Sequence, residues 1–428
     1  MAGRTRHGTG GPLRWLWALV AIVMVAALAA GCGGGDGDEE GGEALKIGLL
    51  FPFTGDLSDF GPAFERTAQM AADEINAAGG VNGRPIELVR ADDGTSPQQA
   101  VEEARRLVEI ERVSAIIGPA SSGATLQVAE SVTGPNRVLE ITSSGTSPAL
   151  TVANDNGYLF RTPISDAAQG LVLADLARER GFRSVCVLYT NNAYGQGLSE
   201  RFQEAFERSG GRVTARIPHE QEQASYSAEL SRCAQGNPDA LAAISYPESA
   251  RVYLREALES GNFRNFLFVD GTKSQSMFND LGVQNFEGMY GTAPGAFDSA
   301  TGRAFDQAYR SRYNEDPEEL PFLRETYDAV YLIALAAQKA RSTDPQKLRE
   351  ALVEVANPGG TTINPGQDGW RAALEALQNG EDVNYEGAAN SADFDENGDI
   401  LKGAIQVWQI RNGTITVLEN REIDLSEQ

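Results

Sequence analysis

Two successive runs of alternating strand and helix patterns constrain the fold of this chain more than any other feature of its sequence. In the first run, short apolar stretches typical of buried strands, such as residues 45–51 and 115–117, alternate with helical patterns such as residues 63–78. The alternation breaks at residues 158–164 and starts again with a predicted helix at residues 167–180. This rhythm is typical of parallel sheets covered by helices. The sequence therefore predicts an α/β fold with two doubly wound parallel-sheet lobes.

The last part of the chain contains too few strand patterns to form a third lobe. Helical patterns at residues 302–313 and 323–340 dominate it, and the chain ends in a predicted hairpin that turns at Asn412-Gly413. The simplest interpretation is that the chain returns to complete both lobes, which are then joined by three hinge crossovers. We expect lobe 1 to comprise residues 45–164 and 293–402, and lobe 2 to comprise residues 165–292 and 403–428.

The first 44 residues have the composition of an export signal followed by a tether. Three arginines precede an apolar run at residues 15–30, which is shorter than the about 20 residues that cross a bilayer as a helix. Small residues then lead into Cys32, and this junction resembles a bacterial lipobox. We expect residues 1–31 to be a signal peptide, Cys32 to be lipidated, and the glycine-rich acidic residues 32–44 to be a flexible tether. An ordinary secretory signal and an uncleaved anchor are the alternatives.

The formal net charge of the chain is −24 at pH 7. A surface this acidic repels the phosphates of nucleic acids and of anionic lipids. We therefore expect no nucleic-acid partner. Any attachment to a membrane has to come from the acyl group on Cys32.

The sequence offers little material for catalysis. His219 is the one histidine outside the leader, and we expect it in an exposed loop because it follows Pro218 after a strand-like stretch. Nucleophile-elbow, zinc-protease and phosphate-loop motifs are absent. Residues 395–399 resemble the start of a calcium loop, but Ile400 and Gln406 stand where that loop needs glycine and glutamate. We therefore expect no enzyme, no cofactor and no metal site.

Two cysteines, Cys186 and Cys233, remain after Cys32. Cys186 lies in a predicted strand, and Cys233 lies on the apolar side of a predicted helix at residues 225–235. If that helix connects the second and third strands of its lobe, a right-handed crossover carries it over the first strand and brings the two sulfur atoms within reach. The sequence leaves two possibilities open: a disulfide, which an exported protein can keep, or two buried free thiols.

Polar residues follow several predicted strands, at the carboxyl ends where parallel α/β sheets bind ligands. In the first lobe, Ser121 and Ser122 follow one strand, and the hydroxyl-rich residues 142–146 follow the next. The second lobe contributes two aromatic rings and one carboxylate at such positions, namely Tyr194, Tyr246 and Asp270. Each of these residues alone could be a helix cap or a turn residue. Taken together, they match a zwitterionic ligand.

Several short motifs, in their order along residues 45–410, resemble a known family. They include Pro52-Phe-Thr-Gly55, Phe60-Gly61, Asp92-Asp93, Gly118-Pro119, Tyr194-Gly195 and Tyr246-Pro-Glu248. The chain resembles the leucine/isoleucine/valine-binding-type, or class I, periplasmic binding proteins. These are the ligand receptors of bacterial transporters for branched-chain amino acids and related small molecules.

The resemblance also implies which residues bind the ligand. The acid that pairs with a ligand ammonium falls on Asp270, where the family often has glutamate, and a second aromatic falls on Ser245 or Tyr246, of which we favour Tyr246. Phe322 is expected to close the apolar side of the site. The other implied positions are Phe60, Ser121, Ser122, Ser144, Gly145, Thr146 and Tyr194. The disulfide that the family carries in its first lobe has no matching cysteines here.

The resemblance implies a receptor that is tethered by lipid to the outer face of the bacterial cytoplasmic membrane. Such a receptor captures a small polar ligand by hinge closure and delivers it to the permease subunits of an ABC transporter. We expect an amino acid or a related amide as the ligand, and a monomeric receptor. Three alternatives remain: a ligand-sensing component of a signalling system, an exported enzyme on the same scaffold, and a structural surface lipoprotein.

Overall fold

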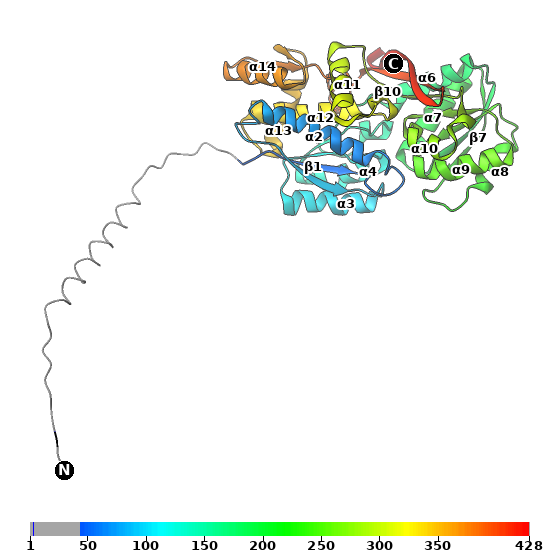
Figure 1. Ribbon diagram of the computed structural model, residues 1–428, viewed down its shortest axis with the longest axis horizontal. Helices are drawn as coiled ribbons and strands as arrows, with labels where there is room; N and C mark the ends of the chain where they lie inside the picture. The colour runs from blue at the N-terminus through cyan, green and yellow to red at the C-terminus, as the bar shows by residue number, and fades with distance from the viewer. Residues whose placement is uncertain (1–2, 4–42, 428) are drawn as a thin grey trace. The chain divides into compact units, whose positions relative to one another are not determined.

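The computed structural model of the chain describes Gly3 and residues 43–427 (Figure 1). The predicted signal peptide, Cys32 and nearly all of the predicted tether lie outside the described residues. Within the described part, no helix combines the length and the apolar composition needed to cross a membrane. The α/β architecture with two parallel-sheet lobes is confirmed.

The first sheet of the described chain is fully parallel, with the strand order β2-β1-β3-β4-β5. Its strands are β1 (Lys46–Phe51), β2 (Glu87–Asp92), β3 (Ala115–Ile117), β4 (Leu139–Thr142) and β5 (Leu159–Arg161). In β1, Ile47 and Leu49 pack into one hydrophobic cluster while Leu50 packs into another, because successive side chains point to opposite faces of a strand. The strand order reverses beside β1, which opens a crevice at the carboxyl ends of β1 and β3.

Helices from both ends of the chain cover this sheet. The yellow and orange helices α12 and α13 lie beside the blue helix α2 in Figure 1, although more than 240 residues separate α2 from α12. The α12 helix is buried along most of its length and packs against both α2 and α13. The helices are α2 (Gly61–Ala77), α3 (Pro97–Arg105), α4 (Ser122–Val128), α5 (Gly134–Asn136), α11 (Ala300–Tyr313), α12 (Leu323–Ala340), α13 (Pro345–Ala356) and α14 (Gln367–Gln378). The π-helical segments are η1 (Arg106–Glu111) and η2 (Ala129–Thr133), and the 3-10 turns are η3 (Pro148–Val152) and η6 (Pro317–Glu319).

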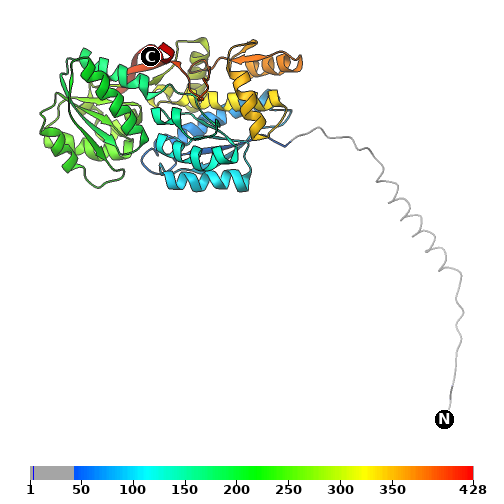
Figure 2. The same cartoon turned by 180° about the vertical axis from the view of Figure 1, so that it is seen from behind.

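The second sheet of the described chain has the order β14-β13-β10-β9-β8-β6-β7. Its green strands run between green helices on either side in Figure 2. The parallel strands are β6 (Ser184–Thr190), β7 (Arg212–His219), β8 (Ala240–Ile244), β9 (Phe266–Phe268) and β10 (Tyr290–Gly295). The predicted C-terminal hairpin, β13 (Lys402–Arg411) and β14 (Thr414–Asp424), adds antiparallel to β10. The helices and turns are α6 (Asp166–Glu179), α7 (Ala193–Arg208), α8 (Ser227–Ala234), α9 (Pro247–Ser260), α10 (Gln275–Asp280), η4 (Asp270–Thr272), η5 (Val283–Phe286) and η7 (Leu425–Glu427).

The chain passes between the two sheets after β5, again after β10, and again before β13. Arg161, the last residue of β5, ties the first and third passages together, because its guanidinium lies 2.6 Å from a carboxylate oxygen of Asp399. The same guanidinium donates to the carbonyl oxygens of Thr146 and Ser147 at 3.1 and 3.0 Å. These passages support our proposal of two lobes joined by three crossovers. The second crossover comes after Gly295, the last residue of β10, and the third comes before Lys402, the first residue of β13, so the proposed boundaries at 292/293 and 402/403 fall just inside these two strands.

Three short strands have no counterpart among the elements predicted from the sequence. They are β5 and the two-stranded pair of β11 (Thr361–Ile363) and β12 (Val383–Tyr385). Each has three residues, which is too few to show an alternating pattern. In β5 the buried charge of Arg161 also hides the strand, because its partner Asp399 lies 238 residues further along the chain.

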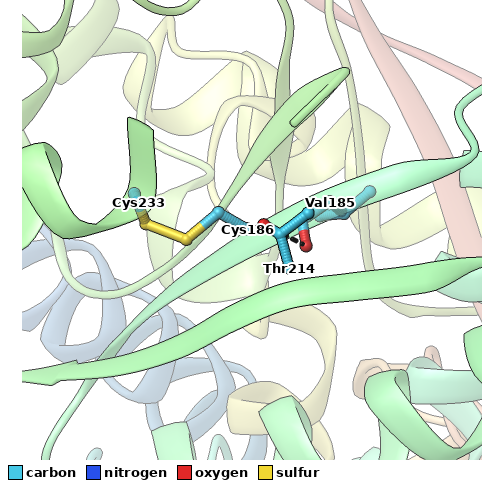
Figure 3. Close-up of a disulfide and its surroundings, with 4 residues drawn as sticks. All are labelled: Val185, Cys186, Thr214 and Cys233. Atoms are coloured by element: carbon cyan, nitrogen blue, oxygen red, sulfur yellow. Dashed lines mark hydrogen bonds between the residues drawn. A yellow bond between two sulfur atoms is a disulfide. The ribbon is translucent and has the colours of Figure 1, made fainter. Parts of the chain in front are cut away.

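Cys186 and Cys233 form a disulfide that joins strand β6, which lies between β7 and β8 in the sheet, to helix α8 (Figure 3). The α8 helix lies between β7 and β8 in sequence and packs against β6, as a right-handed crossover requires. Of the two possibilities that the sequence leaves open, the structure has the bridge. Both cysteines are fully buried in the hydrophobic cluster on this side of the second sheet.

Replacing both cysteines by serine is expected to lower the free energy of unfolding by about 4 kcal/mol in the chain-entropy account, because the bridge closes a loop with a sequence separation of 47 residues. Denaturant unfolding of the full chain measures this loss. Thr214→Ala is a matched control, since it removes only the 3.4 Å hydrogen bond to the carbonyl of Val185 beside the bridge (Figure 3). That control is expected to cost about 1 kcal/mol or less. An equal loss in the two variants would contradict a cross-linking role.

Candidate functional site

A small cavity lies between the carboxyl ends of the two sheets. Residues from both lobes line it: Leu57, Phe60, Ala120, Ser122, Ser144, Tyr194, Tyr246, Asp270 and Gly271. Six of these residues are among the ligand-binding positions predicted from the sequence. They are brought together from six segments of the chain that are far apart in sequence.

The lobe 1 wall presents a hydroxyl group that is oriented by the backbone. Ser122 begins helix α4, and its Oγ accepts hydrogen bonds from the backbone N–H groups of Thr146 and Ser147, both at 3.2 Å. Because these two donors occupy the oxygen lone pairs, the hydroxyl proton of Ser122 is left to donate to another acceptor. The Ser144 hydroxyl, by contrast, donates to the carbonyl of Ala120 at 3.1 Å. The Ser122 hydroxyl is therefore a donor suited to a ligand carboxylate.

Three predicted ligand residues in lobe 1 support the site from behind and do not line the cavity. The Ser121 hydroxyl caps helix α4 by accepting from the N–H of Ala124 at 3.3 Å. The N–H of Gly145 donates to Thr142 Oγ1 at 2.9 Å, and a Cβ at this glycine would lie 2.8 Å from the same oxygen. The N–H of Thr146 donates to the Ser122 oxygen. These N–H groups hold the site loop in place rather than facing the ligand space.

The lobe 2 wall consists of two stacked aromatic rings beside a carboxylate. The rings of Tyr194 and Tyr246 lie 5.4 Å apart and nearly parallel, at 13°. The Tyr194 hydroxyl donates to Asp270 Oδ1 at 2.7 Å, and the Gln169 amide donates to the same oxygen at 2.8 Å. Gly271 must lack a side chain, because a Cβ there would lie 2.4 Å from the carbonyl oxygen of Ser245. Asp270 is therefore held rigidly at the cavity wall.

A second buried carboxylate, Asp166, reinforces the acidic end of the site. Desolvation raises the pKa of Asp270 to about 6, although hydrogen bonds from Tyr194 and Gln169 lower it. Desolvation and then the neighbouring charge of Asp270 raise the pKa of Asp166 well above its ordinary value. Oδ1 of Asp166 has no hydrogen-bond partner among the described residues, while Oδ2 accepts from Thr146 Oγ1 at 3.0 Å. Two neighbouring buried acids, of which Asp166 keeps a free acceptor oxygen, favour a cationic group.

Sequence reasoning missed Asp166 because an acid in the first turn of a helix is ordinary. The one signal in the sequence was the position of Asp166, which directly follows the first passage of the chain between the sheets. Phe322, by contrast, was predicted to close the apolar side of the site, but the structure places it on the wall of a separate cavity.

The prediction of an exposed loop for His219 is wrong. His219 is the last residue of β7 and is buried, because its side chain falls on the inward side of the strand. Its Nδ1–H donates to the carbonyl of Glu220 at 2.9 Å, so its Nε2 accepts from the hydroxyl of Ser245, also at 2.9 Å. Burial lowers the pKa of His219. Ser245 is completely buried, so this serine–histidine pair has no room for a substrate.

Polar contacts join the two lobes along one edge of the cavity. Asp56 in lobe 1 accepts from the N–H and the hydroxyl of Ser249 at 2.9 and 2.6 Å, and burial raises its pKa to about 6. Asp59 pairs with Arg251 at 2.9 Å and accepts from the Ser276 hydroxyl at 2.7 Å. On the other side, the Ser147 hydroxyl donates to the carbonyl of Ala193 at 2.8 Å. The lobes therefore enclose the cavity through hydrogen bonds and ion pairs.

Comparison with known proteins identifies the family. A family model for periplasmic binding proteins matches residues 44–377. The chain belongs to the periplasmic binding protein family. It is 31% identical to the leucine-, isoleucine-, valine-, threonine-, and alanine-binding protein of Pseudomonas aeruginosa, over 72% of this chain and 82% of that protein. The class I resemblance predicted from the sequence is confirmed.

Further relatives of this periplasmic binding protein include a binding protein of a chemotactic signalling system and two binding proteins with solved structures. The chemotactic signal transduction system substrate-binding protein BasB of Halobacterium salinarum is 26% identical, over 82% of this chain and 84% of that protein. The leucine binding protein LivK from Thermotoga maritima superposes with a TM-score of 0.75 and 25% identity, over 90% of this chain and all of that chain. LivJ from Streptococcus pneumoniae, solved with isoleucine, gives a TM-score of 0.73 and 26% identity, over 89% and 100%.

Arg251→Ala is expected to shift the full chain toward an open arrangement, because Arg251 is the cation that joins Asp59 of lobe 1 to lobe 2. Both side chains are largely buried, so the lost pair is expected to cost the closed arrangement about 1–3 kcal/mol. Small-angle scattering measures the change as a larger radius of gyration. Arg201→Ala is the control, since Arg201 pairs with Glu204 within one helix. An unchanged scattering curve for Arg251→Ala would contradict a closing role for this pair.

Proposed function

We propose that this protein is an extracytoplasmic solute receptor that captures an aliphatic α-amino acid between its lobes and delivers it to an ABC transporter. The observation that carries the proposal is the polarity of the cavity, with buried acids at one end and an oriented hydroxyl donor at the other. An ammonium group fits against Asp270 with Asp166 behind it, and a carboxylate fits at Ser122. The names of the relatives agree with this proposal, because they describe proteins that bind amino acids.

The apolar part of the cavity supports an aliphatic side chain. Leu57, Phe60 and Ala120 contribute apolar walls, and the tyrosine rings of lobe 2 face them across the cavity. The cavity is tightly enclosed by both lobes, which favours a small ligand. Leucine, isoleucine and valine are the first ligands to test.

The mechanism that we propose is hinge closure. The ligand docks on one lobe, and the other lobe contacts it only when the cleft is shut. A ligand shifts the equilibrium between the open and closed arrangements only if it makes stronger contacts in the closed one. Asp270 and the tyrosines on lobe 2 and Ser122 on lobe 1 would supply those contacts. We propose that the receptor acts as a monomer on permease subunits, since neither its cavity nor its charge requires another partner.

An exported enzyme on the same scaffold has little support. The relatives are named as binding proteins. The described residues contain no group of histidine, cysteine or acidic side chains that could hold a metal ion. The His219 ring is hydrogen-bonded to the Ser245 hydroxyl and does not line the cavity. Turnover of a bound amino acid by the purified protein would revive the enzymatic alternative.

A signalling role is the second candidate, and the similarity to BasB favours it. Both roles need the same ligand capture, so affinity does not separate them. Reconstitution with the permease subunits does, because a transport receptor stimulates ligand uptake. A receptor that binds the amino acid but leaves uptake unchanged would belong to a signalling system.

Asp270→Asn is expected to weaken amino-acid binding by about 2–5 kcal/mol, because the ligand ammonium loses its buried counter-charge. Calorimetric titration of the full chain with leucine, isoleucine and valine measures the effect. Asp368→Asn is the control, since the Asp368 side chain is fully exposed. Equal affinity in the Asp270 variant and the wild type would contradict the ammonium assignment.

Amino-acid affinity is expected to fall as the pH decreases from 7 to 5. The pKa of Asp270 is raised to about 6 by burial, so Asp270 becomes protonated in this range and no longer attracts an ammonium group. The loss is expected to be smaller in Asp270→Asn, which has no charge to lose at this position. A titration series over pH measures both slopes, and identical slopes would exclude Asp270 as the titrating group.

The lipid anchor at Cys32 is part of the proposal and rests on the sequence around it. Cys32→Ser is expected to move the protein from the membrane fraction to the soluble extracytoplasmic fraction, because a serine cannot carry the thioether-linked lipid. Fractionation and mass spectrometry of the mature N-terminus measure this. An unmodified N-terminus in the wild type would overturn the anchor and leave the binding role intact.

A further inference from the structure

Helix α9 begins at the cavity without a cap from its own lobe. Its N-cap residue is Tyr246, which lines the cavity and whose side chain makes no hydrogen bond to the first turn. Pro247, the first helical residue, has no N–H, and the N–H of Ala250 already donates to the carbonyl of Tyr246 at 2.9 Å. The N–H groups of Glu248 and Ser249 are therefore the donors of this turn that need an acceptor outside the helix.

Asp56 of lobe 1 accepts from both of these donors. The N–H of Glu248 donates to the Asp56 carbonyl at 3.3 Å, and the N–H of Ser249 donates to Asp56 Oδ1 at 2.9 Å. The Ser249 hydroxyl donates to Asp56 Oδ2 at 2.6 Å. Aspartate is one of the best N-cap residues, and its negative charge is favoured at the positive end of a helix dipole. Asp56 therefore caps helix α9 from the opposite lobe.

The loop that carries Asp56 is fixed to the body of lobe 1. The N–H of Leu57 donates to Thr95 Oγ1 at 3.0 Å. Gly55 packs so closely on the neighbouring loop that a Cβ there would lie 2.1 Å from the carbonyl oxygen of Gly94. The loop therefore moves with lobe 1, and the cap on α9 exists only while the two lobes are together.

This cap lies directly beside the ligand cavity. Leu57 follows Asp56 in sequence, and Tyr246 precedes the first turn of α9; both line the cavity. The Tyr246 ring stacks on Tyr194, and its hydroxyl accepts from the side-chain amide of Asn192 at 3.1 Å. A fixed first turn of α9 therefore holds the Tyr246 ring in its place on the cavity wall.

We propose that Asp56 is a positioning residue for ligand capture, which caps helix α9 only in the closed arrangement and so holds the two lobes shut around the ligand. Asp56 itself does not line the cavity. The inference rests on the proposed capture of a ligand by hinge closure. Because the cap forms only after the ligand has docked and the lobes have closed, it slows ligand dissociation and leaves ligand association unchanged.

Stopped-flow measurement of leucine association and dissociation tests the proposal on the full chain. Burial raises the pKa of Asp56 to about 6, so the experiment is done at pH 8, where this carboxylate is ionised. Asp56→Ala is expected to raise the dissociation rate constant about tenfold and to leave the association rate constant within about twofold. Asp56→Asn keeps an oxygen acceptor for the N–H of Ser249 and is expected to stay within about threefold of the wild type in both constants.

Asp344→Ala is the matched control. Asp344 is also an aspartate cap, but it caps helix α13 within its own lobe by accepting from the N–H groups of Gln346 and Lys347 at 3.0 and 3.2 Å. Its loss is expected to lower stability and to leave both rate constants of leucine binding unchanged. An equal rise in the dissociation rate constant of Asp344→Ala and Asp56→Ala would overturn the proposal, because a general loss of stability would then explain both.

Amide hydrogen exchange in the leucine-loaded protein separates a cap that holds the lobes shut from a purely local cap. The N–H of Ser249 depends on the Asp56 carboxylate, whereas the N–H of Glu248 is bonded to the backbone carbonyl of Asp56, which the alanine variant keeps. Asp56→Ala is expected to speed exchange at both amides, because the lobes separate more often. Faster exchange at Ser249 alone would overturn the proposal.

The remaining outcomes also decide. Equal leucine dissociation from Asp56→Ala and the wild type would overturn the proposal. If the wild type binds none of leucine, isoleucine and valine, the proposed amino-acid ligand is wrong, and the exchange comparison in the ligand-free protein decides the role of Asp56. If Asp56→Ala does not fold, Ser249→Ala replaces it, because this variant loses the hydroxyl that donates to Asp56 Oδ2. Ser249→Ala is expected to raise the dissociation rate constant about threefold, and an unchanged value would overturn the proposal.

Discussion

The lobe 1 half of the binding site depends on the buried guanidinium of Arg161. It donates to the carbonyl oxygens of Thr146 and Ser147 and pairs with Asp399, so it connects the site loop to the last passage between the lobes. The same loop directs its N–H groups to the Ser122 oxygen and its threonine hydroxyl to Asp166. A buried ion pair of this kind contributes more to a specific geometry than to net stability. The positions of the ligand-facing groups of lobe 1 thus follow from one interaction at the hinge.

The contacts between the lobes suit a reversible closure. They consist of hydrogen bonds and ion pairs around Asp56, Asp59 and Ser147, whose groups find equivalent partners in water when the lobes separate. Each such contact contributes only about 1–3 kcal/mol net. A ligand that joins Asp270 to Ser122 can therefore decide which arrangement prevails. A large apolar interface would have kept the cleft permanently shut.

Much of the fold and part of the site follow from local sequence patterns. The alternation of strands and helices predicts both sheets, and the positions at strand ends predict Ser122, Tyr194, Tyr246 and Asp270 at the cavity wall. The roles of other residues depend on partners far along the chain and have no local signature. Asp166 looks like an ordinary first-turn acid, and His219 looks like a loop residue. Packing in three dimensions, rather than periodicity, determines where Phe322 points.

The way in which α12 and the C-terminal hairpin complete the two sheets has a consequence for how the protein is made. Helix α12, which covers the first sheet, is synthesised more than 150 residues after the last strand of that sheet. The second sheet receives its two final strands, β13 and β14, later still. Nascent intermediates therefore expose apolar faces on both sheets until synthesis is nearly finished. A chain built in this way completes the packing of both lobes only after its last segments have been synthesised.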